Sequence, residues 1–222
     1  MKVQNAKRIT LFVGHYGSGK TNVAVNFALK LSQFKNNVAI ADLDIVNPYF
    51  RTKDREEELK CKGIKLICSE YANTNVDIPA LPQEMYAITD DKNLNVVIDV
   101  GGDDRGALAL GRLSDAIKQE NDYDMFLVVN KFRPLTRDAD TTIEVMKEIE
   151  YASKLTFTGI VNNSNLGKET TALDVNGSNA YAKEICERTG LPLAFTSVVE
   201  ELADKINNEG DIFAITLEKK LV

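Results

Sequence analysis

The 222-residue sequence contains no tryptophan, one histidine and three cysteines. Cys61, Cys68 and Cys186 are odd in number and form no C-x-x-C pair, so we expect reduced thiols instead of a disulfide framework or a metal site. No apolar run approaches the ~18 residues of a membrane span. Residues 1–14 also lack the apolar core and cleavage site of a secretory signal, so we expect a cytoplasmic protein.

Positive charge is also in short supply. Acidic residues outnumber basic ones by 33 to 27, which gives a net charge of -6. Broad binding to nucleic acid or anionic lipid depends on basic surface, so we expect neither a nucleic-acid partner nor stable membrane association. The C-terminal segment DIFAITLEKKLV carries no net positive charge, and we interpret it as a last structural element instead of a membrane-binding helix.

Short apolar segments alternate with longer amphipathic ones along the chain. Most of the short segments are apolar throughout, which is typical of strands buried on both faces of a parallel sheet. They cover residues 9–14, 38–44, 64–67, 95–100, 125–129, 157–161 and 191–195. We therefore predict an α/β fold, with one domain over residues 1–222 and a mostly parallel sheet of about seven strands flanked by helices.

Apolar residues at helical spacing predict which side chains of the helices face the sheet. The stripes are Val23, Phe27, Leu31 and Phe34 in one helix, and Ile143, Met146 and Ile149 in another. Ser178 is in position to cap a further helix, which is expected to end at Thr189-Gly190. Residues 69–93 are the least regular part, apart from a helix predicted near 82–91.

GHYGSGKT, residues 14–21, fits the phosphate-loop pattern G-x-x-x-x-G-K-[ST]. An apolar strand precedes it and an amphipathic helix follows, as the pattern requires. The glycines let backbone N–H groups approach phosphate oxygens, the lysine reaches the β- and γ-phosphates, and the threonine hydroxyl can bind Mg²⁺. The predicted nucleotide contacts are Gly14, Gly17, Ser18, Gly19, Lys20, Thr21 and Asn22, of which Thr21 is also a predicted metal ligand.

Carboxylates follow two of the predicted strands. Asp42 and Asp44 end the second strand, and residues two apart on a strand point to the same face. Asp99 closes the fourth strand, and Gly101 and Gly102 after it allow the backbone to approach a γ-phosphate. Open α/β sheets bind ligands at this carboxyl edge, so these carboxylates are candidates for holding Mg²⁺. The plain alternative for such an aspartate is the cap of the next helix.

With these residues the sequence resembles the MinD/ParA-type P-loop ATPases. The group includes nitrogenase iron protein, the arsenite and tail-anchored-protein ATPases, and the nickel-insertion ATPases of carbon monoxide dehydrogenase. The resemblance covers most of the chain. Besides the phosphate loop, DLDIVNPYF (42–50) is similar to the first switch of the family, DVGGD (99–103) to the second, and GIVNN (159–163) to the strand end that contacts adenine.

The resemblance implies a nucleotide-dependent homodimer that binds ATP and Mg²⁺, hydrolyses ATP and acts on an unidentified partner protein. It implies that Lys20 acts at the phosphates and that Asp44 positions or activates the attacking water. Asp99 would hold Mg²⁺ through water, with Asp42 supporting the metal. Asp103 would couple the γ-phosphate to a partner surface.

Two segments bear on the choice of base. The resemblance implies that Asn162 contacts the base. VNKFR (129–133) resembles the guanine-reading motif N-K-x-D, but Arg133 occupies the aspartate position and has no acceptor for the guanine hydrogens. We therefore predict ATP instead of GTP as the nucleotide.

The phosphate loop departs from the family at His15. Related proteins typically read G-K-G-G-x-G-K-T, with a lysine that crosses a dimer interface, whereas this chain has His15 and Tyr16. Histidine is shorter and mostly neutral at pH 7, so it does not supply the constant charge of lysine. We interpret His15 as a placeholder; the alternative is that protonated His15 contacts a second nucleotide. If His15 is a placeholder, Arg51 or Arg105, beside the switches, would supply an arginine finger instead.

Two classes of function stay open at this point. The favoured one is a nucleotide-driven switch, in which ATP closes a dimer that loads or remodels a partner and hydrolysis releases it. The alternative is an ATP-dependent small-molecule enzyme, such as a kinase or a ligase similar to dethiobiotin synthetase. That enzyme needs a substrate wall, for which residues 69–93, with Asn75, Asp77 and Pro79, are the candidates.

Overall fold

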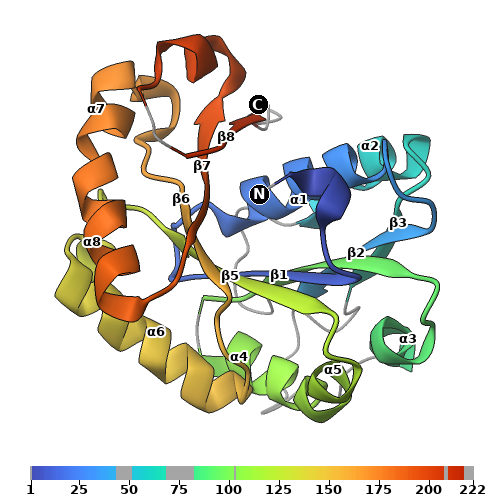
Figure 1. Ribbon diagram of the computed structural model, residues 1–222. Helices are drawn as coiled ribbons and strands as arrows, with labels where there is room; N and C mark the ends of the chain where they lie inside the picture. The colour runs from blue at the N-terminus through green and yellow to red at the C-terminus, as the bar shows by residue number, and fades with distance from the viewer. Residues whose placement is uncertain (1, 44–51, 69–82, 103, 208–209, 218–222) are drawn as a thin grey trace.

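Eight parallel strands form one sheet in the computed structural model, which describes residues 2–43, 52–68, 83–102, 104–207 and 210–217 (Figure 1). The strand order is β3-β2-β4-β1-β5-β6-β7-β8. The strands are β1 Ile9–Val13, β2 Val38–Leu43, β3 Lys65–Cys68, β4 Asn95–Val100, β5 Tyr123–Val129, β6 Gly159–Asn162, β7 Leu193–Val199 and β8 Ile212–Ile215. The predicted α/β class and parallel sheet are confirmed.

β8 is the strand that the apolar pattern did not identify. It has four residues and pairs with β7 at the edge of the sheet, where Ile212 and Ala214 are exposed. The side-chain amide of Asn26, in helix α1 (Lys20–Leu31), forms two hydrogen bonds with the backbone of Thr216, just after β8. Thr216 N donates to Asn26 Oδ1 at 2.9 Å, and Asn26 Nδ2 donates to Thr216 O at 3.1 Å. The C-terminal segment is therefore tied to the helix that follows the phosphate loop.

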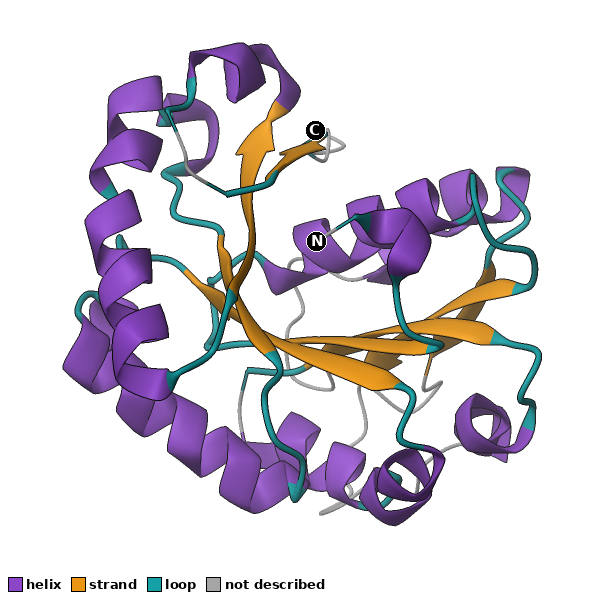
Figure 2. Cartoon of the chain, in the orientation of Figure 1, coloured by secondary structure: helices purple, strands orange, loops and turns teal. Residues whose placement is uncertain are grey.

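Helices cover both faces of the sheet (Figure 2). α1 and α2 contribute to the apolar core on one face, and α3, α4, α5, α6 and α8 to the core on the other. The remaining bounds are α2 Glu56–Cys61, α3 Gln83–Asp90, α4 Asp104–Gly111, α5 Ser114–Glu120, α6 Ala139–Ser153, α7 Ala172–Gly177 and α8 Asn179–Thr189. Across the described residues, no helix combines the length and the hydropathy that crossing a membrane requires.

Aromatic rings fill the core between α1 and the sheet. Their ring centroids lie 5.1 to 6.4 Å apart, in edge-to-face, tilted and stacked arrangements. The rings belong to Phe12, Phe27, Phe126 and Phe195. Such rings combine large buried area with favourable ring contacts, so this cluster fixes where α1 lies on the sheet.

Two local predictions about helices were wrong. Phe34 does not continue the buried stripe, because α1 ends at Leu31 and the Phe34 side chain is 51% exposed. Ser178 lies just before α8 but does not cap it with its hydroxyl, which donates to Val175 O at 2.7 Å. The end of α8 is as predicted, with Gly190 in the left-handed conformation at φ 72°. No disulfide joins the three cysteines.

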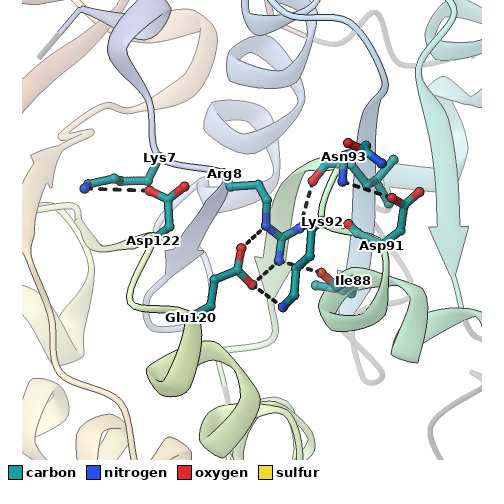
Figure 3. Close-up of polar contacts among 9 residues, drawn as sticks. Lys7, Arg8, Ile88, Asp91, Lys92, Asn93, Glu120 and Asp122 are labelled. Carbon is teal, nitrogen blue, oxygen red and sulfur yellow. Dashed lines mark hydrogen bonds and ion pairs between the residues drawn. The ribbon is translucent and has the colours of Figure 1, made fainter.

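Arg8 joins three elements at the edge of the sheet where the strands begin (Figure 3). Its guanidinium donates to Ile88 O at 3.0 Å, Leu94 O at 2.8 Å and Asp91 O at 3.3 Å. It also forms a bidentate ion pair with Glu120 at the end of α5, from Nε to Oε1 and from Nη2 to Oε2. Both side chains are largely buried, at 8% and 13% exposure, so the pair replaces water as the partner of each charge.

The Arg8 hydrogen bonds hold the pKa of Glu120 below its usual value, against the partial burial that raises it. The carboxylate therefore contributes stability above the unfolded pKa, about 4.3, and that contribution is lost as the pH falls through the folded pKa. We predict that Glu120→Gln lowers the free energy of unfolding by about 2 kcal/mol at pH 7. The difference from wild type should shrink at acidic pH, as measured by urea unfolding at each pH.

Asp122→Asn is the matched control for this prediction. Asp122 pairs with Lys7 at 3.6 Å, but the two side chains are 46% and 51% exposed. An exposed pair of this kind contributes at most about 1 kcal/mol. Equal effects of the two substitutions, or a Glu120→Gln effect independent of pH, would contradict the role given to the Arg8–Glu120 pair.

Candidate functional site

The phosphate-loop sequence joins β1 to α1 at the carboxyl edge of the sheet. β1 lies between β4 and β5, and the chain fills the sheet on one side of β1 before it crosses to the other. Open α/β sheets form a crevice at such a reversal of strand order. The loop is therefore at the position where a parallel sheet of this topology binds ligands.

The start of α1 differs from the start of α6. Gly19 occupies the position before the helix with φ 82°, no side chain caps it, and no acidic residue lies in the first turn. By contrast, Asp138 caps α6 by accepting from Thr141 N at 2.9 Å. A helix start with neither cap nor acid presents partial positive charge and N–H groups to an anion.

Gly19 is required by its surroundings as well as by its backbone conformation. A Cβ atom at this position would lie 2.3 Å from Asn163 Nδ2. Asn163 itself is 2% exposed and donates to Ser18 O at 2.6 Å. The loop therefore passes directly against the end of β6, and any side chain at Gly19 would displace it.

Asp42 and Asp99 lie side by side near the carboxyl ends of β2 and β4, where they are register partners. Side chains alternate along a strand, so they share the face of Ile40 and Val97, which belong to the core beneath α1. Asp99 is fully buried and Asp42 is 9% exposed. The two predicted metal carboxylates are thus brought together on the face covered by α1.

Asp42, Asp99 and Thr21 fit the donor preference of Mg²⁺, which takes oxygen ligands and retains several waters. Thr21 is in the first turn of α1 and is 7% exposed, and Lys20 beside it is 3% exposed. Within the described ranges, no three histidine, cysteine, aspartate or glutamate side chains gather into a metal cluster. A Mg²⁺ ion held by these residues would keep several waters in its shell.

Thr52 lies beside Asp99 in the structure, although the sequence pattern did not identify it as a site residue. It begins the short helix η2 (Thr52–Arg55), has no exposed surface, and lies 3.4 Å through Oγ1 from Asp99 Oδ2. This is a long hydrogen bond, in which the hydroxyl donates to the carboxylate. Its only sequence signal is a hydroxyl residue just after DLDIVNPYF.

Gly102 brings the segment after β4 onto the phosphate loop. A Cβ atom on Gly102 would lie 2.5 Å from Gly14 O and 2.5 Å from Tyr16 N. Only glycine allows this approach without moving one of the two backbones. The predicted second switch therefore begins in contact with the loop that it is expected to sense.

His15 is partly exposed, and its Nδ1 lies 3.2 Å from Tyr16 O. A carbonyl only accepts, so this contact requires the proton on Nδ1. Tyr16 is 57% exposed. The remaining candidates lie outside the described residues, or, for Arg105, have a side chain that does: Asp44, Arg51, Asn75, Asp77, Pro79, Asp103 and Arg105.

The two asparagines of GIVNN have different surroundings. Asn162 is fully buried, donates to Ser178 Oγ at 2.8 Å and accepts from Ser164 Oγ at 2.7 Å. Its role in reading the base stays a prediction. Asn163, which the sequence analysis did not assign, is the one that contacts the phosphate loop. Asn22 lies in α1 next to Thr21 and is partly exposed.

Comparison with known proteins gives a family and a fold. The family described as CbiA, the CobQ/CobB/MinD/ParA nucleotide binding domain, matches residues 9–174. No curated protein sequence matches the chain.

Among solved structures, the chain is similar to FtsY from Mycoplasma mycoides, with TM-score 0.59, 21% identity and coverage of 89% of this chain and 62% of the other. Chloroplast FtsY from Physcomitrella patens has a TM-score of 0.61 and 16% identity, with coverage of 90% of this chain and 61% of the other. The GDP complex of the signal recognition particle receptor FtsY from Elizabethkingia anophelis has a TM-score of 0.55 and 16% identity, with coverage of 90% of this chain and 60% of the other. The chain thus spans about three-fifths of the length of these structures, and at this identity they share its fold.

Thr52→Val tests whether the Thr52 hydroxyl orients Asp99 toward a cation. Groups that position metal ligands typically change metal affinity by about tenfold or more when removed. The measurement is a Mg²⁺ titration of the binding of a fluorescent ATP analogue, in which we expect the half-saturating Mg²⁺ concentration to rise about tenfold. Binding of the analogue in the absence of Mg²⁺ should not change. Thr52→Ser keeps the hydroxyl and should behave as wild type. An unchanged Mg²⁺ titration for Thr52→Val would contradict this role.

Proposed function

Because the chain belongs to the CobQ/CobB/MinD/ParA nucleotide-binding family, we propose that it is a Mg²⁺-dependent ATPase that acts as a nucleotide-driven switch on a partner protein. The observation that carries the proposal is the convergence of the phosphate loop, the uncapped start of α1 and the Asp42–Asp99 pair at one edge of the sheet. A triphosphate needs donors at its oxygens, and its cation needs carboxylates nearby.

The proposed roles follow from position and chemistry. Lys20 and the N–H groups at the start of α1 bind phosphate oxygens, and Thr21, Asp42 and Asp99 hold Mg²⁺ directly or through water. Bound there, Mg²⁺ would neutralise charge on the β- and γ-phosphate oxygens. Asp44 positions the attacking water in this proposal.

ATP is the proposed nucleotide because of Arg133. Guanine recognition by N-K-x-D needs a carboxylate that accepts two hydrogens, and an arginine supplies only donors. The GDP complex named above belongs to a protein with 16% identity to this chain, a level that supports a shared fold and leaves the base open.

We further propose that ATP closes a homodimer, which then binds its partner, and that Asp103 couples the γ-phosphate to the partner surface. The small-molecule enzyme, with residues 69–93 as its substrate wall, is the competing function. Steady ATP hydrolysis without any added metabolite, together with ATP-dependent dimerisation by light scattering, is the result expected of a switch. A protein that stays monomeric and hydrolyses ATP only when a metabolite is added would favour the competing enzyme.

Lys20→Ala tests the phosphate-loop assignment. The substitution removes the cation proposed to reach the β- and γ-phosphates, so ATP binding should be lost at concentrations that saturate the wild type, as measured by calorimetry. Unchanged ATP affinity in Lys20→Ala would refute the assignment.

Competition between nucleotides tests the choice of base. In the wild type, GTP should compete poorly with ATP. Equal affinity for ATP and GTP would refute the choice of ATP.

Asp44→Ala separates binding from hydrolysis. Positioning of water by a side chain typically contributes about 100-fold or more to rate. We therefore expect kcat to fall by at least about 100-fold, while ATP affinity from calorimetry stays close to wild type. Equal losses of affinity and rate would instead assign Asp44 to metal binding or to structure.

A further inference from the structure

Two side chains hold consecutive carbonyl groups of the phosphate loop. Arg133 Nε donates to Gly17 O at 2.8 Å, and Asn163 Nδ2 donates to Ser18 O at 2.6 Å. Arg133 lies in the turn after β5, and Asn163 directly follows β6. We call Arg133 and Asn163 the carbonyl clamp.

The Arg133 side of the clamp rests on a rigid turn. Arg133 N donates to Asn130 O at 3.1 Å, and Thr136 N donates to Arg133 O at 3.1 Å. Asn130 is fully buried, and its Oδ1 accepts from Phe132 N at 3.0 Å. The backbone of Arg133 is therefore fixed although its side chain is exposed, so only the rotamer freedom of the side chain is lost when it binds the loop.

The Asn163 side of the clamp is fixed from within the sheet. Ser197 Oγ, on β7, donates to Asn163 Oδ1 at 2.7 Å, and Asn163 N donates to Val129 O at 2.8 Å. With its oxygen occupied by Ser197, the amide can present only its NH₂ group to the loop. Ser18 O is thus met by a buried donor whose orientation is already set.

Holding these carbonyls determines where the next N–H groups point. A trans peptide unit is planar, with C=O and N–H directed to opposite sides. When Gly17 O faces Arg133, Ser18 N–H turns into the loop, where it donates to His15 O at 3.0 Å. When Ser18 O faces Asn163, Gly19 N–H turns to the side away from β6. Gly17 and Gly19 have φ of 78° and 82°, a pattern that aligns N–H groups around an anion.

Arg133 also brings permanent positive charge to the loop. A Cβ atom on Gly17 would lie 3.7 Å from Arg133 Cζ, so the guanidinium lies against the loop backbone. Across the described residues, Gly17 O is the only hydrogen-bond partner recorded for its side chain. His15, which stands where the family carries lysine, lacks the constant charge of a lysine.

We propose that the carbonyl clamp holds the loop in its phosphate-binding shape, and that Arg133 is a further affinity-determining residue for the triphosphate chain. The inference rests on the proposed binding of a nucleoside triphosphate. Arg133 acts in it as a positioning residue and as a source of charge. It does not contact the base.

Calorimetric titration with ATP, adenosine and inorganic tripolyphosphate tests the clamp. Loss of a hydrogen bond from a charged donor typically weakens binding about tenfold or more. Arg133→Ala should weaken ATP and tripolyphosphate binding by a similar factor, about tenfold, and leave any adenosine binding unchanged. The salt dependence of ATP affinity should become shallower, because one cation near the phosphates is removed.

Asn163→Asp keeps the acceptor for Ser197 but places a carboxylate against Ser18 O. It should weaken ATP and tripolyphosphate at least as much as Arg133→Ala. Arg137→Ala is the matched control, since Arg137 is an exposed arginine of the same turn that pairs with Asp138 at 3.3 Å instead of the loop. Its affinities should equal those of wild type. Arg133 is exposed, so Arg133→Ala is expected to fold even if Asn163→Asp does not.

Each outcome bears on a distinct claim. If wild type binds ATP and Arg133→Ala binds it equally well, the clamp is refuted and the proposed function stands. If Arg133→Ala weakens ATP but not tripolyphosphate, Arg133 contacts the nucleoside and the clamp is again refuted. If wild type binds neither ATP nor tripolyphosphate, the proposed function fails and the clamp fails with it.

Discussion

The parallel register of β2, β4 and β1 is the constraint on which the candidate site depends. Asp99 is the register partner of Asp42 on one side and of Phe12 on the other, so a single row across three strands carries both carboxylates on the face of α1. A slip of one residue would turn a carboxylate into the opposite core, among side chains such as Ile98 and Val100. Burying an unpaired charge there costs far more than the slip gains, so the carboxylates help to set the register that positions them.

The position of α1 links this row to the phosphate loop. Phe27, midway along α1, contacts Phe12 and Phe195 in the core beneath it. Next to Phe27, Asn26 holds Thr216 by two hydrogen bonds. The core packing and these hydrogen bonds together oppose sliding of the helix, so they help to fix its first turn, which carries Lys20. Core substitutions far from the loop are therefore expected to alter phosphate binding through the helix.

The sequence predicted those parts that depend on local pattern. Apolar runs located seven strands, and the spacing of GHYGSGKT located the loop, because each signal is contained within a few residues. The rest depends on contacts across the fold. Phe34 continues the apolar spacing but follows the end of its helix, and Thr52 matters only because the chain returns to Asp99. Asn163 contacts the phosphate loop because β6 ends against that loop, which the sequence pattern does not reveal.

The charge of the loop is the last consequence of this arrangement. A triphosphate needs cations as well as N–H groups, and the family's lysine is replaced here by His15. With Nδ1 donating to Tyr16 O, a neutral His15 ring keeps an acceptor at Nε2, and an acceptor does not bind a phosphate oxygen. A histidine does not carry the constant charge of a lysine, so a constant positive charge at the loop has to come from other residues. The start of α1 contributes a fraction of a charge and Lys20 a whole one. Arg133 donates to the loop backbone from the turn after β5, so in our proposal it supplies within one chain a cation comparable to the lysine that related proteins carry in this loop.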